Sequence, residues 1–154
     1  MDAAIRHILA AVDFSPAAEQ TLHWASREAL LHGARLTIAH VFSPQAMNLQ
    51  LPEEILPPDL DLMTRLRKLA EVELQKLKSH CDPKLKATET LLIDSSEGIG
   101  HALVQEAQRS AVDLIVVASH GQGVLGRLLL GSVATDIVHH AHCAVLVVRP
   151  QSKN

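Results

Sequence analysis

Aromatic residues are scarce in this 154-residue chain, which has no tyrosine, one tryptophan and two phenylalanines. Proteins that bind single-stranded nucleic acid stack the bases on aromatic side chains, so this sequence does not fit that class. Basic residues are not in excess either, because 14 lysines and arginines stand against 17 aspartates and glutamates. A formal net charge of −3 argues against a protein held on nucleic acid or on a membrane surface by phosphate contacts.

Cysteine and long apolar runs are also scarce. Two cysteines, Cys81 and Cys143, make a poor disulfide framework, and reduced thiols in a cytosolic compartment are the simpler interpretation. No stretch reaches the roughly 18 apolar residues of a membrane span, and residues 1–6 lack the apolar core of a signal peptide. We therefore expect a cytoplasmic protein with no nucleic-acid partner and no membrane insertion.

The composition is that of a globular protein. Hydrophobic residues make up 47% and charged residues 20% of the chain, which is too apolar for a disordered protein. A chain of this length suits one domain and buries enough surface to fold without a metal or a disulfide. We expect residues 1–154 to form a single domain.

Short apolar runs alternate with helical patterns along the whole chain. Strands are predicted at 8–12, 36–42, 87–93, 114–118 and 144–148, with helices at about 16–32, 61–80, 97–110 and from 131 onward. This alternation indicates an α/β fold, an open parallel sheet with helices on both faces. Ligands of such sheets bind beyond the carboxyl ends of the strands, where the strand order reverses. Asp13, residues 40–42 and residues 119–132 follow strands and are the first places to search for a site.

Local signals refine the predicted helices. Ser15 followed by Pro16 is typical of an N-cap and first helical residue, and Gly33 is well placed to end that helix in a left-handed conformation. Helical spacing places Leu69 or Ala70 on the apolar face of the second helix and Val138 on that of the last helix.

Residues 119–132 contain four of the seven glycines of the chain. Glycine lets backbone amides turn toward an anion without a side chain in the way. Gly131 and Ser132 then open a helix whose free amides and dipole favour a phosphate, and Gly131 is expected to need a positive φ or close phosphate approach. A glycine-rich loop followed directly by a helix N-terminus offers two anion-binding elements, which suits a polyphosphate. The alternative is a loop that only turns the chain from strand to helix.

Two familiar phosphate-binding patterns fit this stretch poorly. Gly121, Gly123 and Gly126 satisfy G-x-G-x-x-G, but they follow the fourth strand and do not open a helix directly, which disfavours dinucleotide binding. Gly121 and Gly126 also have the Walker A spacing, yet Arg127 and Leu128 replace the required Lys-Ser/Thr. Phosphotransfer by a P-loop is therefore not indicated.

Other stretches accompany the glycines. The first strand ends in Ala-Val-Asp-Phe-Ser, the last helix begins within Leu-Leu-Leu-Gly-Ser-Val, and the last strand reads Ala-Val-Leu-Val-Val-Arg. Between them, Ala118-Ser119-His120-Gly121 is followed by nine residues and then Gly131-Ser132. Together these features resemble the universal stress protein family, whose nucleotide-binding members carry Gly-x2-Gly-x9-Gly-Ser/Thr after the fourth strand. The resemblance covers nearly the whole chain, and its one departure is Ala118, where the first glycine of the motif belongs.

The resemblance implies a fold and a ligand. The fold is a five-stranded sheet of order 3-2-1-4-5, of the adenine nucleotide alpha hydrolase-like type, which binds ATP or AMP between strands one and four. Mg²⁺ would accompany a triphosphate. In the implied site Asp13 lies near the ribose, the backbone of Val41 meets the adenine, and residues 131–133 hold the outer phosphates. The implied nucleotide-binding residues are Ala11, Asp13, Val41, Ala118, Ser119, His120, Gly121, Gln122, Gly131, Ser132 and Val133.

The implied function is regulatory nucleotide binding in the stress response. Because the last strand is apolar and would lie at a sheet edge, we also expect a homodimer through Val145–Arg149. One alternative is a dimeric interaction module of the same fold that binds no nucleotide, which Ala118 favours. Another is a slow ATPase or autophosphorylating protein with Ser132 as the acceptor. No general base can be assigned, so we name no catalytic residue.

Three histidines and a cysteine gather at the predicted end of the last helix, namely His139, His140, His142 and Cys143. Such ligands could bind zinc or copper. However, neighbouring residues of a helix point about 100° apart, and no carboxylate is expected nearby to support a metal ligand. We therefore expect no metal site, and interpret the histidines as a solvated helix end.

Overall fold

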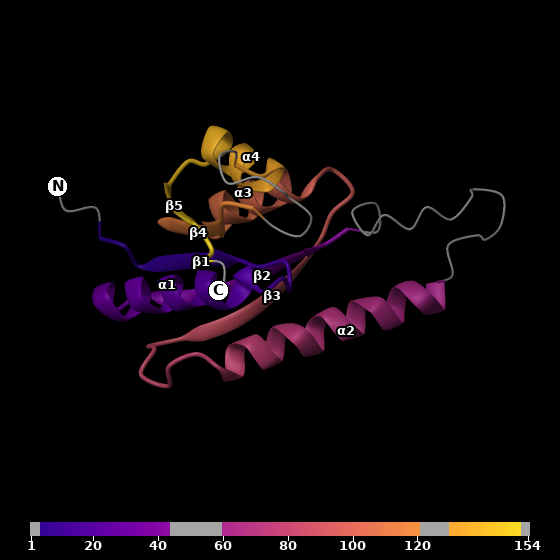
Figure 1. The fold of residues 1–154 in the computed structure, drawn as a ribbon, viewed down its shortest axis with the longest axis horizontal. Helices are drawn as coiled ribbons and strands as arrows, with labels where there is room; N and C mark the ends of the chain where they lie inside the picture. The colour runs from indigo at the N-terminus through magenta and orange to yellow at the C-terminus, as the bar shows by residue number, and fades with distance from the viewer. Residues whose placement is uncertain (1–3, 44–59, 121–129, 152–154) are drawn as a thin grey trace.

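The computed structural model describes residues 4–43, 60–120 and 130–151 (Figure 1). Strands and helices alternate throughout, as the sequence predicts. In chain order the elements are β1 (His7–Ala11), α1 (Ala17–His32), β2 (Arg35–Phe42), α2 (Leu60–Ser79), β3 (Thr88–Asp94), α3 (Ile99–Arg109), β4 (Leu114–Ala118), α4 (Ser132–His140) and β5 (Ala144–Val148).

The five strands form one parallel sheet of order β3-β2-β1-β4-β5, which confirms the predicted topology. Ile8 lies opposite Leu36 of β2 on one side and Leu114 of β4 on the other. The chain moves outward from β1 to β3 and then returns to the other side of β1. The strand order therefore reverses between β1 and β4, where their carboxyl ends leave room for a ligand.

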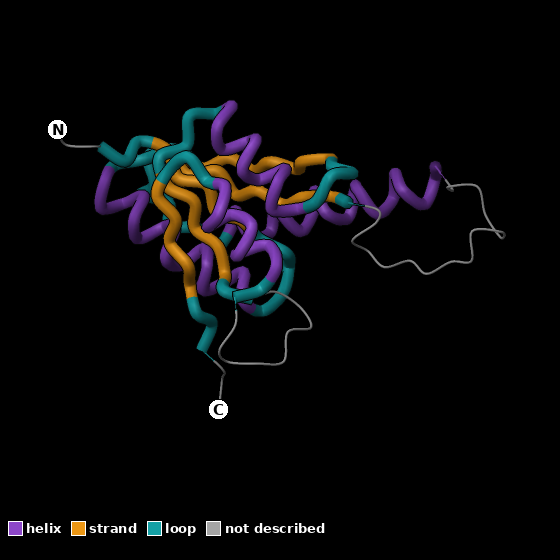
Figure 2. Tube along the Cα trace, turned by 90° about the horizontal axis from the view of Figure 1, so that it is seen from above, coloured by secondary structure: helices purple, strands orange, loops and turns teal. Residues whose placement is uncertain are grey.

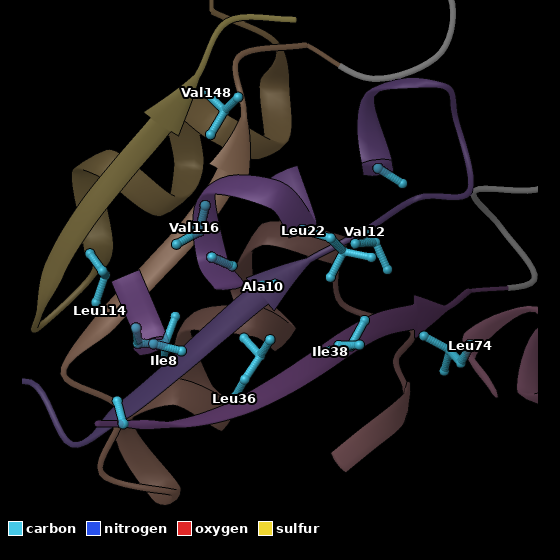
Figure 3. Close-up of a cluster of buried hydrophobic side chains, with 14 residues drawn as sticks. Ile8, Ala10, Val12, Leu22, Leu36, Ile38, Leu74, Leu114, Val116 and Val148 are labelled. Atoms are coloured by element: carbon cyan, nitrogen blue, oxygen red, sulfur yellow. The ribbon is translucent and has the colours of Figure 1, made fainter. Parts of the chain in front are cut away.

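Helices cover both faces of the sheet, with α1 and α2 on one face and α3 and α4 on the other (Figure 1). Successive residues of a strand point to opposite faces, so Ile8 and Ala10 join the first core while Leu9 and Ala11 join the second. Figure 3 shows the first core around Ile38, Leu22 and Val116. All five residues of β1 are buried, as expected for a strand covered on both faces.

The tube view from above shows the strands between the helices, and the N-terminal end of α2 extends past them (Figure 2). Within the part of the chain that the structure describes, no helix combines the length and apolar character needed to cross a bilayer.

The start of α1 differs from the prediction. The Ser15 hydroxyl does not cap the helix, and it is buried with no hydrogen-bond partner among the described residues. Pro16 occupies the cap position with a helical backbone, and the Ser15 carbonyl accepts a hydrogen bond from the Ala18 N–H at 2.9 Å. The end of the helix is as predicted, because Gly33 adopts a left-handed φ of 61°.

Leu69 and Ala70 were alternatives for the apolar face of α2, and Val138 was predicted to face the core. Leu69 is 60% exposed, because its neighbour Ala70 occupies the buried position on α2. Val138 is 46% exposed, since Ala134 and Ile137 form the buried stripe of α4. In both helices a one-residue step of about 100° separates the two positions.

A buried polar network crosses the amino-terminal half of the sheet. His7 is only 3% exposed, and its Nε2 lies 2.8 Å from the Thr37 hydroxyl. That hydroxyl donates to Glu89 Oε1 at 2.8 Å, so His7 Nε2 must be the donor toward Thr37. The chain of hydrogen bonds joins β1, β2 and β3 and satisfies polar groups that would be costly to bury alone.

Helices α3 and α4 approach closely at Gly100. A Cβ atom on Gly100 would lie 2.7 Å from the Cβ of Asp136, closer than two carbon atoms can pack. The glycine therefore sets the distance between the two helices, and through it the position of α4.

We predict that Gly100→Ala lowers the free energy of unfolding by about 1–3 kcal/mol, as overpacking does. This loss should exceed the gain of about 1 kcal/mol that alanine gives in a helix. Urea unfolding measures the difference. Gln105→Ala, at an exposed position of the same helix, is the control and should change stability little. A Gly100→Ala protein as stable as the wild type would contradict the proposed steric role.

Candidate functional site

A cleft of about 650 Å³ lies beyond the carboxyl ends of β1, β2 and β4. It is at the reversal of strand order, where open α/β sheets bind ligands. Helix α2 contributes to its wall as well as α3 and α4. The residues predicted from the sequence that line it are Ala11, Asp13, Val41, Ala118, His120, Gly131, Ser132 and Val133.

Three predicted residues are not among those that line the described part of the cleft, and only one of them, Ser119, belongs to the described residues. Ser119 is buried beside the cleft, and its hydroxyl lies 2.9 Å from His120 Nδ1. Gly121 and Gln122 lie outside the described residues. The ligand-binding role of all eleven residues stays a prediction.

The turn after β1 carries Asp13 into the cleft. Asp13 is exposed and lines the cavity, while its Oδ1 accepts a hydrogen bond from the Ser15 N–H at 3.0 Å. The next residue, Phe14, has a φ of 61°, a left-handed conformation that bulky side chains rarely adopt. The turn is thus a short, strained segment that presents one carboxylate.

His40, near the end of β2, contacts the same turn. Its Nδ1 lies 2.8 Å from the Val12 carbonyl oxygen, and because a carbonyl only accepts, Nδ1 carries the proton. Its ring stacks on Phe14 with 4.1 Å between centroids. Burial lowers the pKa of His40, an effect that the hydrogen bond to Val12 and the charge of Asp13 oppose.

The other end of the cleft is formed by the start of α4. Gly131 has φ −63° and ψ 164°, which any residue can adopt, so a positive φ is not its reason for being glycine. Space is the reason instead, because a Cβ atom there would lie 3.2 Å from His120 Cα and 3.3 Å from the Ser119 oxygen. The Gly131 N–H also donates to that oxygen at 2.6 Å.

The N-terminus of α4 has the electrostatic character of an anion site. No side chain caps it in the described structure, and its first turn holds no acidic residue. Gly131, Ser132 and Val133 all line the cleft, so the amide end of the helix borders the cavity. Unpaired amides and the positive end of the helix dipole favour a negatively charged group.

Several cleft residues were not predicted as site residues. Phe14 and His40 lie beside Asp13, and Leu66, Ala70 and Glu73 of α2 also line the cleft. The sequence did place His40 at the end of a strand, where ligands of such sheets bind, but it indicated no role for the side chain. For α2, helical periodicity indicates which side is buried but not that the helix borders a cleft.

The histidines near the end of α4 do not gather into a metal site in the described structure, where no three potential ligands meet. The expectation that no carboxylate lies near them was wrong. His140 Nδ1 is 3.0 Å from Asp136 Oδ1, one helical turn earlier.

Both cysteines are half-buried free thiols. Burial raises the pKa of Cys81 and that of Cys143, which disfavours the reactive thiolate at neutral pH.

Comparison with known proteins identifies the family. A model of the universal stress protein family matches residues 4–149. The chain belongs to the universal stress protein family. It is 31% identical over 145 residues to universal stress protein A homolog 1 of Coxiella burnetii, covering 93% of this chain and 95% of the relative. It is 33% identical over 144 residues to a Mycolicibacterium smegmatis universal stress protein, covering 92% of this chain but 47% of the relative. The chain therefore spans about half the length of that second relative.

Solved structures share the fold. The universal stress protein UspA of Lactobacillus plantarum has a TM-score of 0.70 and 25% identity, covering 96% of this chain and 100% of its own. A universal stress protein of Archaeoglobus fulgidus in complex with dAMP has a TM-score of 0.58 at 21% identity, covering 93% and 96% of the two chains. A family protein of Arabidopsis thaliana with AMP bound has a TM-score of 0.61 at 17% identity, covering 96% and 93%.

We predict that His7 and His40 make the stability of this universal stress protein pH-dependent. Burial lowers the pKa of both below the ordinary 6.5, so the unfolded chain binds these protons more tightly than the folded one. The free energy of unfolding should therefore fall as the pH drops below 6.5, and the stabilisation should be complete above it.

Urea unfolding at several pH values measures this effect, and His7→Asn and His40→Asn are the informative variants. Each should flatten the decline, because each removes one group that the folded state keeps neutral. If neither variant changes the slope of stability against pH, the decline comes from other groups.

Proposed function

We propose that this universal stress protein binds an adenine nucleotide, AMP or ATP, in the cleft beyond β1 and β4. The bound nucleotide would act as a regulatory ligand in the stress response. The observation that carries the proposal is that the uncapped start of α4 borders the same cleft as Asp13 and Val41.

The two ends of the cleft differ in the way that a nucleotide requires. At the end of β2 the wall includes Val41 and Phe42, which are apolar, and at the end of β4 lies the start of α4. Two strand spacings, roughly 10 Å, separate β2 from β4. A base at the first end and phosphates at the second would place the ribose near Asp13 on the central strand.

Relatives and cleft chemistry support the same ligand class. The Archaeoglobus protein was solved with dAMP and the Arabidopsis protein with AMP, and both share this fold. A cleft of about 650 Å³ is within the usual range for small-molecule sites. Mg²⁺ binds through one or two carboxylates plus substrate phosphates, and Asp13 and Glu73 are carboxylates that line this cleft.

The departure from the family motif at Ala118 does not by itself oppose the proposal. Among the described non-glycine residues only Phe14 and Ala111 have a positive φ, so position 118 does not need the conformational freedom of glycine. Ala118 ends β4 and pairs with Val148 as an ordinary strand residue. Ala118 does line the cleft, and the nucleotide-free interaction module is the alternative that the following test can select.

We predict that ATP with Mg²⁺, or AMP, raises the melting temperature. At 100 times the Kd the stabilisation is about 2.7 kcal/mol, an easily measured shift. Gly131→Val should abolish most of this shift, because its side chain would crowd both the phosphate position and the Ser119–His120 backbone. Each variant is compared with its own ligand-free melting temperature, since Gly131→Val also destabilises the free protein.

Ser132→Ala is the matched mild variant. It removes one hydroxyl but keeps the backbone amides, so it should reduce the stabilisation by no more than about 1–2 kcal/mol. NAD should produce little shift, because the glycines follow the wrong strand for a dinucleotide site. A wild-type protein that melts at the same temperature with ATP, ADP and AMP would favour the nucleotide-free module.

We also propose a homodimer through residues 145–149. In the described sheet β5 is an edge strand with apolar side chains, and pairing with a second copy would cover that edge. Val147→Lys should give a monomer or a precipitate in sedimentation, whereas Leu31→Lys, on an exposed position of α1, should leave the dimer intact. A wild-type monomer at micromolar concentration would contradict the dimer.

A further inference from the structure

The most strained part of the described cleft is the turn that holds Asp13. Phe14 has a φ of 61°, although no glycine is present to relieve the steric cost of a left-handed backbone. Such conformations persist only where the surrounding structure over-determines them, and they concentrate at functional sites.

His40 holds the turn from both sides of Asp13. On the preceding residue, its Nδ1–H donates to the Val12 carbonyl oxygen at 2.8 Å. On the following residue, its ring lies against Phe14 at 4.1 Å with 34° between the planes. A backbone hydrogen bond also joins the turn to β2: the Val12 N–H donates to the Ala39 carbonyl oxygen at 2.9 Å.

These contacts leave Asp13 little freedom. Its backbone is fixed on both sides, and its Oδ1 accepts the Ser15 N–H, while the side chain remains exposed in the cleft. We infer that His40 is a positioning residue that aims the Asp13 carboxylate at the ligand, an inference that rests on the proposed nucleotide function. Through His40, the location of the Asp13 carboxylate on the turn after β1 depends on the location of β2.

The two contacts of His40 can be separated by substitution. His40→Asn keeps an N–H donor at the place of Nδ1 but removes the ring. His40→Phe keeps a ring against Phe14 but removes the donor. His40→Ala removes both. His7→Asn is the matched control, because His7 is a buried histidine in the neighbouring strand that bonds across the sheet far from the cleft.

The first measurement is the Kd for AMP by calorimetry, well below the melting temperature of each variant. We expect His40→Ala to weaken binding on the order of tenfold, the equivalent of about 1.4 kcal/mol. His40→Asn and His40→Phe should each retain part of the affinity. His7→Asn should lower the melting temperature without changing the Kd. A Kd that is unchanged in His40→Ala, or weakened equally in His7→Asn, would overturn the positioning role.

The second measurement needs no nucleotide. Hydrogen exchange of the Ser15 amide reports the bond to Asp13 Oδ1, and it should accelerate in His40→Ala more than in His7→Asn. Equal exchange in His40→Ala and wild type would overturn the inference. If the wild type binds no adenine nucleotide while this exchange difference is present, the proposed function fails and the structural control of Asp13 by His40 stands.

Discussion

Burial of β1 on both faces is the constraint on which the rest of this structure depends. Its side chains alternate between two separate cores, one under α1 and α2 and the other under α3 and α4. A strand that is covered on both sides accepts few polar groups, so the first exposed charged residue after it is Asp13. The central position of β1 in the sheet then places that carboxylate between the carboxyl ends of β2 and β4. The location of the cleft is thus a consequence of how the sheet is packed.

The end of the cleft at the start of α4 depends on packing of a different kind. Helix α4 has nine residues and is held by few buried side chains, chiefly Ala134 and Ile137. Its approach to α3 is set by Gly100, and its first residues touch the β4 loop at Gly131. The absence of a side chain at Gly100 and at Gly131 therefore lets the N-terminal amides of α4 lie beside the cavity. This end of the site is built by close contact and the helix dipole, without a charged side chain in the first turn.

Much of the fold could be predicted because apolar runs carry a clear signal. The bounds of β4 and β5 agree with the prediction, since both runs are uniformly apolar and end abruptly. The predicted Ser15 cap was wrong because the cap position is taken by Pro16 with a helical backbone, and the Ser15 hydroxyl is buried without a partner among the described residues. Likewise the contact between His40 and Phe14 joins the end of β2 to the turn after β1, across the whole of α1 in the sequence. No spacing rule could have indicated it.

At three positions of this site, the residue type can be compared with the backbone conformation and the space that the structure shows there. The family motif expects glycine at 118, yet Ala118 lies in ordinary strand geometry and needs none. At 131 glycine is favoured by tight space and not by conformation. Phe14 has the left-handed backbone that glycine would adopt without strain, but it is a bulky aromatic residue. The Phe14 ring packs against His40. A glycine at this position would relieve the backbone strain but would lose the side chain that fixes the turn. Strain and positioning are here two effects of one residue choice, and both act on Asp13.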